Sequence, residues 1–344
     1  METREPSFDR YQRQSTLPQI GAPGQRRLRA ARVLLVGCGA LGGVIAEQLA
    51  RAGVGFMRIV DRDVVELTNL QRQVLFDESD ARDGLPKAIA AARRLARVNS
   101  EIVIEPHVTD VDGENAEALA DGVQVILDGT DNVETRYLLN DVSVKRSVPW
   151  VYGACVGTEG RVLAIRPNHG PCLRCIFPTP PLAGELPTCD TAGVLGPAAA
   201  VVGAMQSASA IKLLVGADDG LDEMVVLDLW TNRIRTIDTT AARRPDCPTC
   251  GQGRFEFLDR KSRDTTTRLC GRNAVQVRGT AAISLDQLAD RLAGGARVTR
   301  SEHLVRATLE GGIDLTAFPD GRVIVHGTGD VARARSIYAR FIGA

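Results

Sequence analysis

Short apolar runs alternate with amphipathic helical patterns through the first half of the chain. The runs that predict strands lie in RVLLVG, FMRIVD, IVIEP, VQVILDGTDN and VPWVYGA, which start at positions 32, 56, 102, 123 and 148. Helical periodicity covers the segment that ends at Arg51, and then LPKAIAAARRLARVN and VETRYLLNDVSVKR. Strands that alternate with helices of this length are typical of βαβ units, so we expect a mostly parallel sheet.

The pattern changes in the second half of the chain. GRVLAIRP predicts a further strand, and EMVVLDLWTNRIRTID predicts two paired strands around Trp230 and Thr231. We therefore expect an α/β fold, with a Rossmann-like, mostly parallel sheet that continues into an antiparallel portion. The most apolar stretch, residues 193–216, contains Gln206 and Lys212. We interpret it as a buried core helix, because a membrane span needs about 20 apolar residues with few polar breaks.

The composition changes again near Asp259, where DRKSRDTTTR is polar throughout. This predicts a first domain at residues 1–257, a linker at 258–272 and a small α+β module at 273–344. The module's apolar runs and turn signals predict a strand, a helix, three strands and a final helix. Its LTAFPDGRVIVHG stretch would offer hairpin edges for docking, which suggests a role in partner recognition.

Charge and composition narrow the function classes. Lys+Arg and Asp+Glu both number 42, and aromatic residues make up 4%, which argues against a nucleic-acid partner or an anionic membrane surface. The N-terminal METREPSFDRYQRQ lacks the apolar core of a secretory signal. With eight Cys and no such signal, we expect a cytoplasmic protein whose thiols bind metal or do chemistry.

The first candidate site is a glycine-rich turn between the first predicted strand and its helix. Gly37, Gly39 and Gly42 form the pattern GxGxxG. Glycines there permit a tight turn and let backbone N–H groups approach a phosphate at the helix N-terminus. Asp61 ends the next predicted strand, where a carboxylate can bind ribose hydroxyls. Taken alone, these residues allow either NAD(H) or ATP.

The segment that follows favours ATP. DRDVVELTNLQRQVLF begins at Asp61 and places Arg72 on a loop just beyond the strand. A triphosphate site needs such a side chain, because a guanidinium offers several donors to phosphate oxygens. Lys87 begins a predicted helix, and Asp131 in DGTDN could hold Mg²⁺ between phosphates.

The order of these motifs resembles that of a known family. RYQRQ, VGCGALGG, VDRD, TNLQRQ, PKA, DGTDN, PCLRC, TAGVLGP and CPTCG occur in the order seen in the MoeB/ThiF/HesA family, and the resemblance covers about residues 8–253. These are bacterial relatives of ubiquitin-activating enzymes. The resemblance implies that the C-terminal glycine carboxylate of a small ubiquitin-like carrier attacks the α-phosphate of ATP, giving an acyl-adenylate and pyrophosphate.

The resemblance also implies a role for each matching position. Asp61 would bind the ribose, Arg72 would be a catalytic phosphate contact, and Lys87 would neutralise charge in the transition state. Asp131 would hold Mg²⁺. Arg13 would reach the γ-phosphate of ATP in a partner subunit, which implies a homodimer. The implied ATP-binding set comprises Gly37, Gly39, Ala40, Gly42, Asp61, Asp63, Asn69, Arg72, Gln73, Lys87, Asp131 and Asn132. The family often has glycine at the position of Ala40.

Two CxxC pairs, Cys172/Cys175 and Cys247/Cys250, each fit half of a tetrathiolate zinc site. Their spacing alone also allows two separate redox or unpaired motifs. The resemblance implies a single structural Zn²⁺ that is bound by all four thiolates.

Cys189 lies in the Pro- and Gly-rich stretch LPTCDTAGVLGP. In sulfur-transferring members of the family, a cysteine at this place links covalently to the activated carrier or carries a persulfide, and a thiolate is a good nucleophile for that step. An inert loop thiol is the alternative. Residues 271–344 contain no Cys, so no rhodanese loop is present and the sulfur donor would be separate. Cys38 and Cys155 are interpreted as packing residues, and Cys270 has no assignment.

The favoured function is therefore ATP-dependent adenylation of a sulfur carrier with a Gly-Gly C-terminus, followed by conversion to a thiocarboxylate. The pathway stays open between molybdopterin, thiamine, tRNA thiolation and a sulfur-containing metabolite. The alternatives are adenylation of another carboxylate or peptide, a tRNA-modification dehydratase of the same superfamily, an NAD-dependent oxidoreductase, or a non-catalytic scaffold. NLQRQ differs from the loop usual in such dehydratases, while Arg72, Lys87 and Asp131 disfavour NAD.

Overall fold

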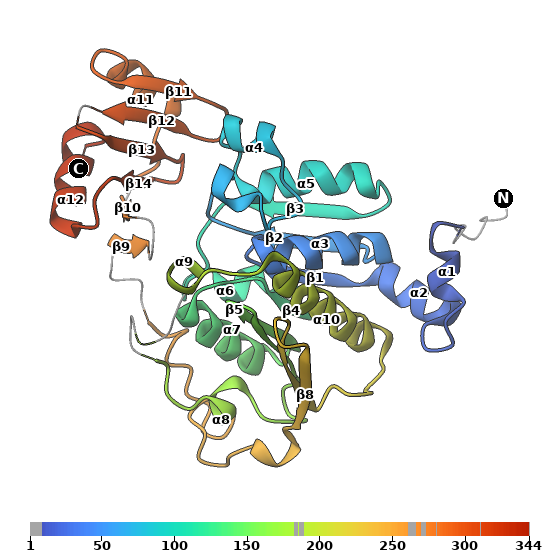
Figure 1. Ribbon diagram of the computed structural model, residues 1–344. Coiled ribbons are helices and arrows are strands. Elements are labelled where there is room, and N and C mark those ends of the chain that lie inside the picture. Colours follow the sequence, from blue (N-terminus) through green and yellow to red (C-terminus); the bar gives the residue numbers. More distant parts are fainter. Residues whose placement is uncertain are drawn as a thin grey trace. The chain divides into compact units, whose positions relative to one another are not determined.

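The computed structural model describes residues 9–181, 185, 189–260, 266–269, 273–279, 281–309 and 311–343, with backbone alone at 189–190 and 267–269. The chain forms two compact units, Met1–Lys261 and Ser262–Ala344. Each unit has a sheet and a hydrophobic core of its own (Figure 1).

The first unit is built on an eight-stranded sheet with the order β3-β2-β1-β4-β5-β6-β7-β8. Strands β1 to β5 pair in parallel, whereas β6, β7 and β8 are added antiparallel. This confirms the predicted parallel sheet that continues into an antiparallel portion. The strands are β1 (Arg32–Val36), β2 (Phe56–Val60), β3 (Val103–His107), β4 (Val125–Asp128), β5 (Trp150–Val156), β6 (Glu159–Ile165), β7 (Glu223–Asp228) and β8 (Arg233–Asp238).

Helices cover both faces of this sheet (Figure 1). One core contains residues of α3, α5 and α10, and the other contains residues of α6 and α7. Successive residues of β1 enter opposite cores: Val33 and Leu35 the first, Leu34 and Val36 the second. A strand buried on both faces must be apolar at every position, which explains the unbroken VLLV run. These helices are α3 (Ala40–Ala52), α5 (Lys87–Val98), α6 (Ala116–Leu119), α7 (Val133–Arg146) and α10 (Gly196–Val215).

Among the described residues, α10 is the one helix whose length and composition would allow it to cross a membrane. Its polar side chains make contacts inside the protein. The Gln206 amide donates to the carbonyls of Asp128 at 2.7 Å and Val151 at 3.2 Å, and the Ser207 hydroxyl donates to the Gly203 carbonyl at 2.8 Å. Buried polar donors that are paired inside the protein in this way are expected of a core helix, as the sequence predicts.

The N-terminal segment is anchored by polar side chains. Tyr11 is buried, and its hydroxyl accepts a 2.8 Å hydrogen bond from the Asn99 amide. The Gln14 amide donates to the Gln25 side chain at 2.7 Å. The remaining helical elements of this unit are η1 (Asp9–Tyr11), α1 (Gln12–Ser15), α2 (Gly21–Ala30), η2 (Leu67–Asn69), α4 (Glu78–Asp83), α8 (Leu173–Ile176), α9 (Cys189–Ala192) and η3 (Thr240–Ala242).

The second unit is an α+β module with a six-stranded antiparallel sheet of order β11-β12-β13-β14-β10-β9. Its core joins one face of the sheet to α11 and α12. The α+β class is confirmed, but two strands were not predicted: β11, which is short and mostly exposed, and β9, which lies within the predicted linker 258–272. The elements are β9 (Thr266–Leu269), β10 (Ala274–Arg278), α11 (Leu285–Leu292), β11 (Arg297–Arg300), β12 (Val305–Leu309), β13 (Ile313–Ala317), β14 (Arg322–His326) and α12 (Val331–Phe341).

Candidate functional site

The carboxyl ends of β1 and β4 meet where the strand order reverses, which is where open α/β sheets bind nucleotides. Gly37 follows β1 with φ +84°, and Gly129 follows β4. An added Cβ would lie 2.2 Å from the Gly37 carbonyl oxygen if placed on Gly129, and 1.9 Å from it if placed on Gly42. These three glycines therefore allow close backbone contacts within the glycine turn and between the two loops, and a side chain at any of them would displace the backbone.

Gly39 is glycine for a different reason. A Cβ on Gly39 would meet nothing closer than the Gln73 amide nitrogen at 3.6 Å, so protein packing alone does not demand glycine there. Gly39 precedes α3, whose first residue is Ala40, and no side chain caps this helix. An uncapped helix N-terminus beside an open glycine suits a phosphate group.

Asp61 is held rigidly beside the glycine turn. Its Oδ2 accepts from the Cys38 N–H at 2.7 Å, and its Oδ1 accepts from the Asp63 N–H at 2.7 Å. Burial raises the pKa of Asp61, and the nearby Lys87 ammonium opposes this rise. Each carboxylate oxygen keeps a lone pair that could accept from a ligand hydroxyl. Burial also raises the pKa of the Cys38 thiol, which suits a packing residue better than a nucleophile.

Lys87 is 3% exposed and begins α5. Its Nζ lies 3.2 Å from Asp63 Oδ2, and Arg62 Nε lies 3.7 Å from Asp63 Oδ1. A buried ammonium needs a neighbouring carboxylate to remain charged, so Asp63 stabilises the charge of Lys87. The sequence analysis singled out Lys87 and Asp63 but missed Arg62. The Arg62 guanidinium donates to Asp110 at 2.8 Å, and the two residues are 48 positions apart, so no local sequence pattern reveals the contact.

The residues expected to contact phosphates lie on a compact loop after β2. Asn69 Oδ1 accepts from the Glu66 N–H at 3.1 Å and stabilises η2. Gln73 is buried with its amide nitrogen toward Gly39, and its Oε1 has no hydrogen-bond partner among the described residues. Arg72 is partly exposed. An unsatisfied buried oxygen beside the glycine turn is expected where a ligand completes a site.

Asp131 is exposed and immediately precedes Asn132. The Asn132 side chain caps α7, because its Oδ1 accepts from the N–H groups of residues 134 and 135 at 2.8 and 3.3 Å. Burial lowers the pKa of Arg62, but Asp110, Asp63 and then Asp131 together hold it above its usual value. Asp131 therefore adds negative charge near Arg62. Carboxylate and phosphate oxygens are the ligands that Mg²⁺ prefers, so the exposed Asp131 carboxylate fits that ion.

The structure places Arg13 away from the glycine turn. It is exposed on α1, and the neighbouring Gln14 donates to the Ala52 carbonyl at 3.0 Å. Ala52 ends α3, whereas the glycine turn precedes the first residue of that helix. Since a 13-residue helix is about 20 Å long, Arg13 cannot reach the glycine turn of its own subunit.

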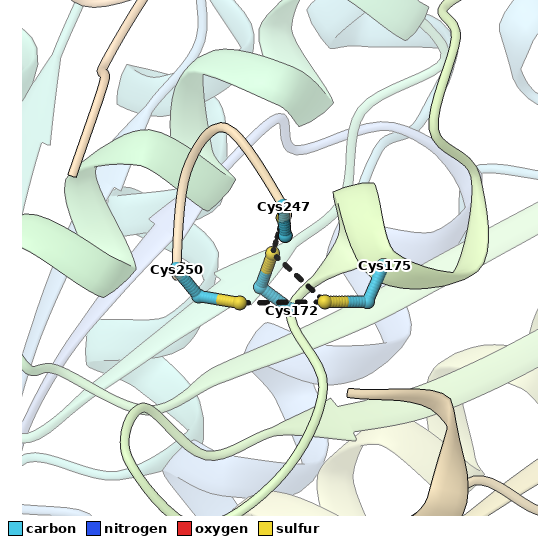
Figure 2. A group of neighbouring side chains, drawn as sticks. All are labelled: Cys172, Cys175, Cys247 and Cys250. Atoms are coloured by element: carbon cyan, nitrogen blue, oxygen red, sulfur yellow. Dashed lines mark hydrogen bonds between the residues drawn. The ribbon is translucent and has the colours of Figure 1, made fainter. Parts of the chain in front are cut away.

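The four predicted zinc ligands converge (Figure 2). The sulfurs of Cys172 and Cys175 are 4.0 Å apart, those of Cys172 and Cys247 are 3.6 Å apart, and those of Cys175 and Cys250 are 3.3 Å apart. All four lie within 4.8 Å of one another. A tetrahedral Zn²⁺ with bonds of about 2.3 Å would hold its sulfurs about 3.8 Å apart, so the cluster fits that ion and the distances exclude disulfides. Cys270 lies outside the described residues.

Two adjacent residues of α7 anchor the two halves of this cluster. Asn140 Oδ1 accepts from the Leu173 N–H at 2.8 Å, next to the first cysteine pair. Asp141 accepts from the Thr249 hydroxyl at 3.0 Å, inside the second pair, and from the Phe257 N–H at 2.9 Å. The sequence analysis missed both anchors. Their only signal in the sequence is that two adjacent polar residues lie in the middle of a predicted helix. The structure shows that both positions are buried.

Cys189 begins α9, and its side chain lies outside the described residues. The chain after α9 is tied to the sheet, since the backbone at 193–195 exchanges hydrogen bonds of 2.9 and 2.8 Å with Gly157. At the start of α10, a Cβ on Gly196 would lie 3.7 Å from Arg72. The segment that follows Cys189 is thus fixed next to the predicted phosphate loop.

Comparisons with known proteins identify relatives of the chain. The ThiF family matches residues 11–249. The sulfur carrier protein ThiS adenylyltransferase of Bacillus subtilis is 41% identical over 337 residues, which are 97% of this chain and 99% of that protein. The SAMP-activating enzyme E1 of Haloferax volcanii is 40% identical over 253 residues, which are 73% of this chain and 92% of that protein.

A solved structure shares the architecture. The crystal structure of Escherichia coli MccB with ATP matches with a TM-score of 0.62 at 23% identity, covering 71% of this chain and 75% of that one. At this identity the likeness concerns the fold. The family match covers more than half of the chain, and the Bacillus relative covers almost all of it. The resemblance seen in the sequence is confirmed: the chain belongs to the ThiF family.

Proposed function

We propose that this chain uses ATP to adenylate the C-terminal carboxylate of a ubiquitin-like sulfur carrier protein. The observation that carries the proposal is the 41% identity, over 97% of the chain, to a relative named as the adenylyltransferase of the sulfur carrier ThiS. A relative named sulfur carrier protein adenylyltransferase, from Thermus thermophilus, is 40% identical over 250 residues. A ThiS-type carrier is therefore the first substrate to test.

The reaction would be an in-line displacement at the α-phosphorus of ATP. A carboxylate oxygen of the carrier forms the new bond to phosphorus, the bond to the β-bridging oxygen breaks, and pyrophosphate leaves. Asp61 would hold the ribose hydroxyls, while the uncapped N-terminus of α3 would hold phosphate oxygens. Lys87 and Arg72 would offset the negative charge of the transition state. Catalysis would then consist mainly of positioning and electrostatic stabilisation.

Two metal ions fit the residues present. Asp131, together with phosphate oxygens of ATP, would hold Mg²⁺, which when bound supplies positive charge between the phosphates. The four cysteines would hold Zn²⁺. Because four thiolates fill a tetrahedral coordination sphere, the zinc would be structural.

We assign Arg13 to the ATP site of a second copy of the chain. The support is its exposure and its anchorage at the far end of α3 from its own glycine turn. Arg13→Ala and Lys87→Ala would each be inactive alone. When the two variants are mixed and exchange subunits, the mixture should regain about a quarter of wild-type activity. Half of the dimers would then contain one subunit of each variant, and one of the two sites in each of these dimers would be intact. No recovery after subunit exchange would refute a shared site.

We assign Cys189 to the sulfur-transfer step, with the sulfur supplied by a separate donor. The support is the fixed segment that follows Cys189, which lies next to Arg72. Cys189→Ala should leave adenylation intact and block formation of the thiocarboxylate. If thiocarboxylate forms at the wild-type rate, Cys189 has no such role.

The main proposal is tested by carrier-dependent exchange between ATP and labelled pyrophosphate. We expect exchange with a Gly-Gly-ended ThiS-type carrier and none with the same carrier lacking its last glycine. Lys87→Ala should abolish exchange. The matched control is Lys145→Ala, which removes an exposed lysine paired with Glu117 and should leave exchange unchanged. Absence of exchange with every Gly-Gly-ended carrier would overturn the proposal.

We propose that the second unit recognises a partner, and that the unit is dispensable for adenylation itself. The Haloferax relative is covered to 92% by 253 residues of this chain, too few to span both units. Removing residues 262–344 should preserve exchange at saturating carrier and raise the KM for the carrier. An unchanged KM would refute carrier recognition by this unit.

A further inference from the structure

Thr130, in the loop between β4 and α7, is held by a buried carboxylate and a largely buried guanidinium. Asp128 is fully buried, and its Oδ1 accepts from the Thr130 N–H at 2.9 Å and from the Thr130 hydroxyl at 2.7 Å. Arg136 Nη2 donates to the Thr130 carbonyl at 2.7 Å and to the Gly153 carbonyl at 3.2 Å. Every polar group of Thr130 is therefore engaged by these two side chains.

The two charged groups also contact each other. Arg136 Nε lies 3.3 Å from Asp128 Oδ2, and the guanidinium stacks 5.5 Å from the centre of the Tyr152 ring. Removing a carboxylate and a guanidinium from water costs about as much as their attraction returns, so a buried pair is a weak source of stability. Its value lies in fixing one geometry, and here the geometry that it fixes is that of Thr130.

The rest of the loop is fixed as well. The Gly129 N–H donates to the Val36 carbonyl at 2.8 Å, and Gly129 interlocks with the glycine turn. On the other side of Asp131, Asn132 caps α7. Asp131 thus stands between two immobilised neighbours while its own side chain is exposed.

We propose that Asp128 and Arg136 are positioning residues that hold the Thr130 segment so that the Asp131 carboxylate meets the divalent cation of metal-bound ATP. This rests on the proposed function. The guanidinium is needed for its shape, because it reaches two carbonyls and one carboxylate at once. A lysine ammonium at position 136 would keep the charge but could not span all three.

The test measures divalent-cation binding as well as turnover. Mn²⁺ binding is followed by electron paramagnetic resonance in the presence of a non-hydrolysable ATP analogue, and pyrophosphate exchange is titrated with Mg²⁺. For Arg136→Lys and Thr130→Val we expect the Mg²⁺ and Mn²⁺ concentrations at half-saturation to rise about tenfold, the effect of losing one or two hydrogen bonds. Binding of the analogue without metal should be unchanged.

Matched controls separate positioning from general damage. Thr130→Ser keeps the hydroxyl that Asp128 accepts from. Arg146→Lys alters an exposed arginine of the same helix, which pairs with Asp121. Both should titrate like the wild type. If Arg136→Lys does not fold, Thr130→Val still decides the question.

Wild-type Mn²⁺ half-saturation in folded Thr130→Val, or in Arg136→Lys, would overturn the inference. A wild-type protein that binds Mn²⁺ and the analogue but shows no exchange with any carrier would instead refute the proposed function. In that case the Mn²⁺ titration of the variants would still test the positioning role.

Discussion

Replacing Asp141 with alanine would test how the second cysteine pair is held. The buried carboxylate accepts hydrogen bonds from the Thr249 hydroxyl at 3.0 Å and from the N–H groups of Phe257 at 2.9 Å and Leu258 at 3.4 Å. Alanine would leave the buried Thr249 hydroxyl and the Phe257 N–H without a partner. The contact to Leu258 is long and contributes little.

The magnitude follows from these two groups. A buried donor that loses its acceptor lowers the free energy of unfolding by about 1–3 kcal/mol, so the loss of both hydrogen bonds would lower it by about 2–6 kcal/mol. Part of this is returned, because burial raises the pKa of Asp141 and so disfavours its charged form in the folded protein. We expect a net loss of about 2–4 kcal/mol, a large share of the roughly 5–15 kcal/mol that stabilises a typical domain.

The assay is denaturant unfolding followed by tryptophan fluorescence. Both tryptophans of the chain, Trp150 and Trp230, belong to the first unit, so the signal reports on that unit. Release of the proposed zinc to a coloured chelator should also be faster, because Thr249 lies between the two cysteines of the second pair. Asp121→Ala, which removes a mostly exposed carboxylate, should leave both measurements unchanged. A change below about 1 kcal/mol with wild-type zinc release would refute the reasoning.

Three further outcomes are expected. Gly42→Ala would place a methyl 1.9 Å from a backbone oxygen and should weaken ATP binding more than tenfold in calorimetry. The control Gly43→Ala, whose added Cβ would have its nearest neighbour at 3.7 Å, should bind ATP normally. Equal ATP affinities of the two variants would contradict this prediction. Gln206→Leu removes donors to two carbonyls and should lower the unfolding free energy by about 1–3 kcal/mol, and an unchanged denaturation midpoint would argue against it. The Arg58 guanidinium lowers the pKa of Glu105 from 4.5, so the charged carboxylate stabilises the fold above pH 4.5 and loses this effect as the pH falls. Glu105→Gln should therefore be less stable than the wild type at pH 7, and the difference should shrink in acid. A difference that stays constant with pH would refute the assignment.

Much of the first unit is predictable because its constraints are local. Strands buried on both faces require unbroken apolar runs, so β1 and β4 stand out in the sequence. Gly37 and Gly42 are required by a positive φ and a close backbone approach, and such requirements leave a recognisable glycine pattern. The convergence of the two cysteine pairs, in contrast, followed from resemblance and not from spacing.

The features that the sequence analysis missed depend on partners that no local pattern reveals. The anchors of the cysteine cluster join positions 33 and 108 residues apart, and Arg136 meets Asp128 across a turn that looks like ordinary helix-start chemistry. β9 has four residues, two of them threonine, within a polar stretch, so its pairing with β10 rather than its own pattern makes it a strand. The roles of Arg13 and Cys189 stay predictions that the mixed-subunit and thiocarboxylate experiments will decide.

Helix α7 sets the spacing and the relative orientation of two sets of contacts in the first unit. Arg136 fixes the Thr130 segment, and about one turn later Asn140 and Asp141 fix the two cysteine pairs. Each residue rotates an α-helix by about 100°. Inserting or deleting one residue between Arg136 and Asn140 would therefore turn one set of contacts away from its targets while the other stayed in place. The number of residues in this stretch is therefore fixed, and the side chains between the two sets of contacts are themselves buried.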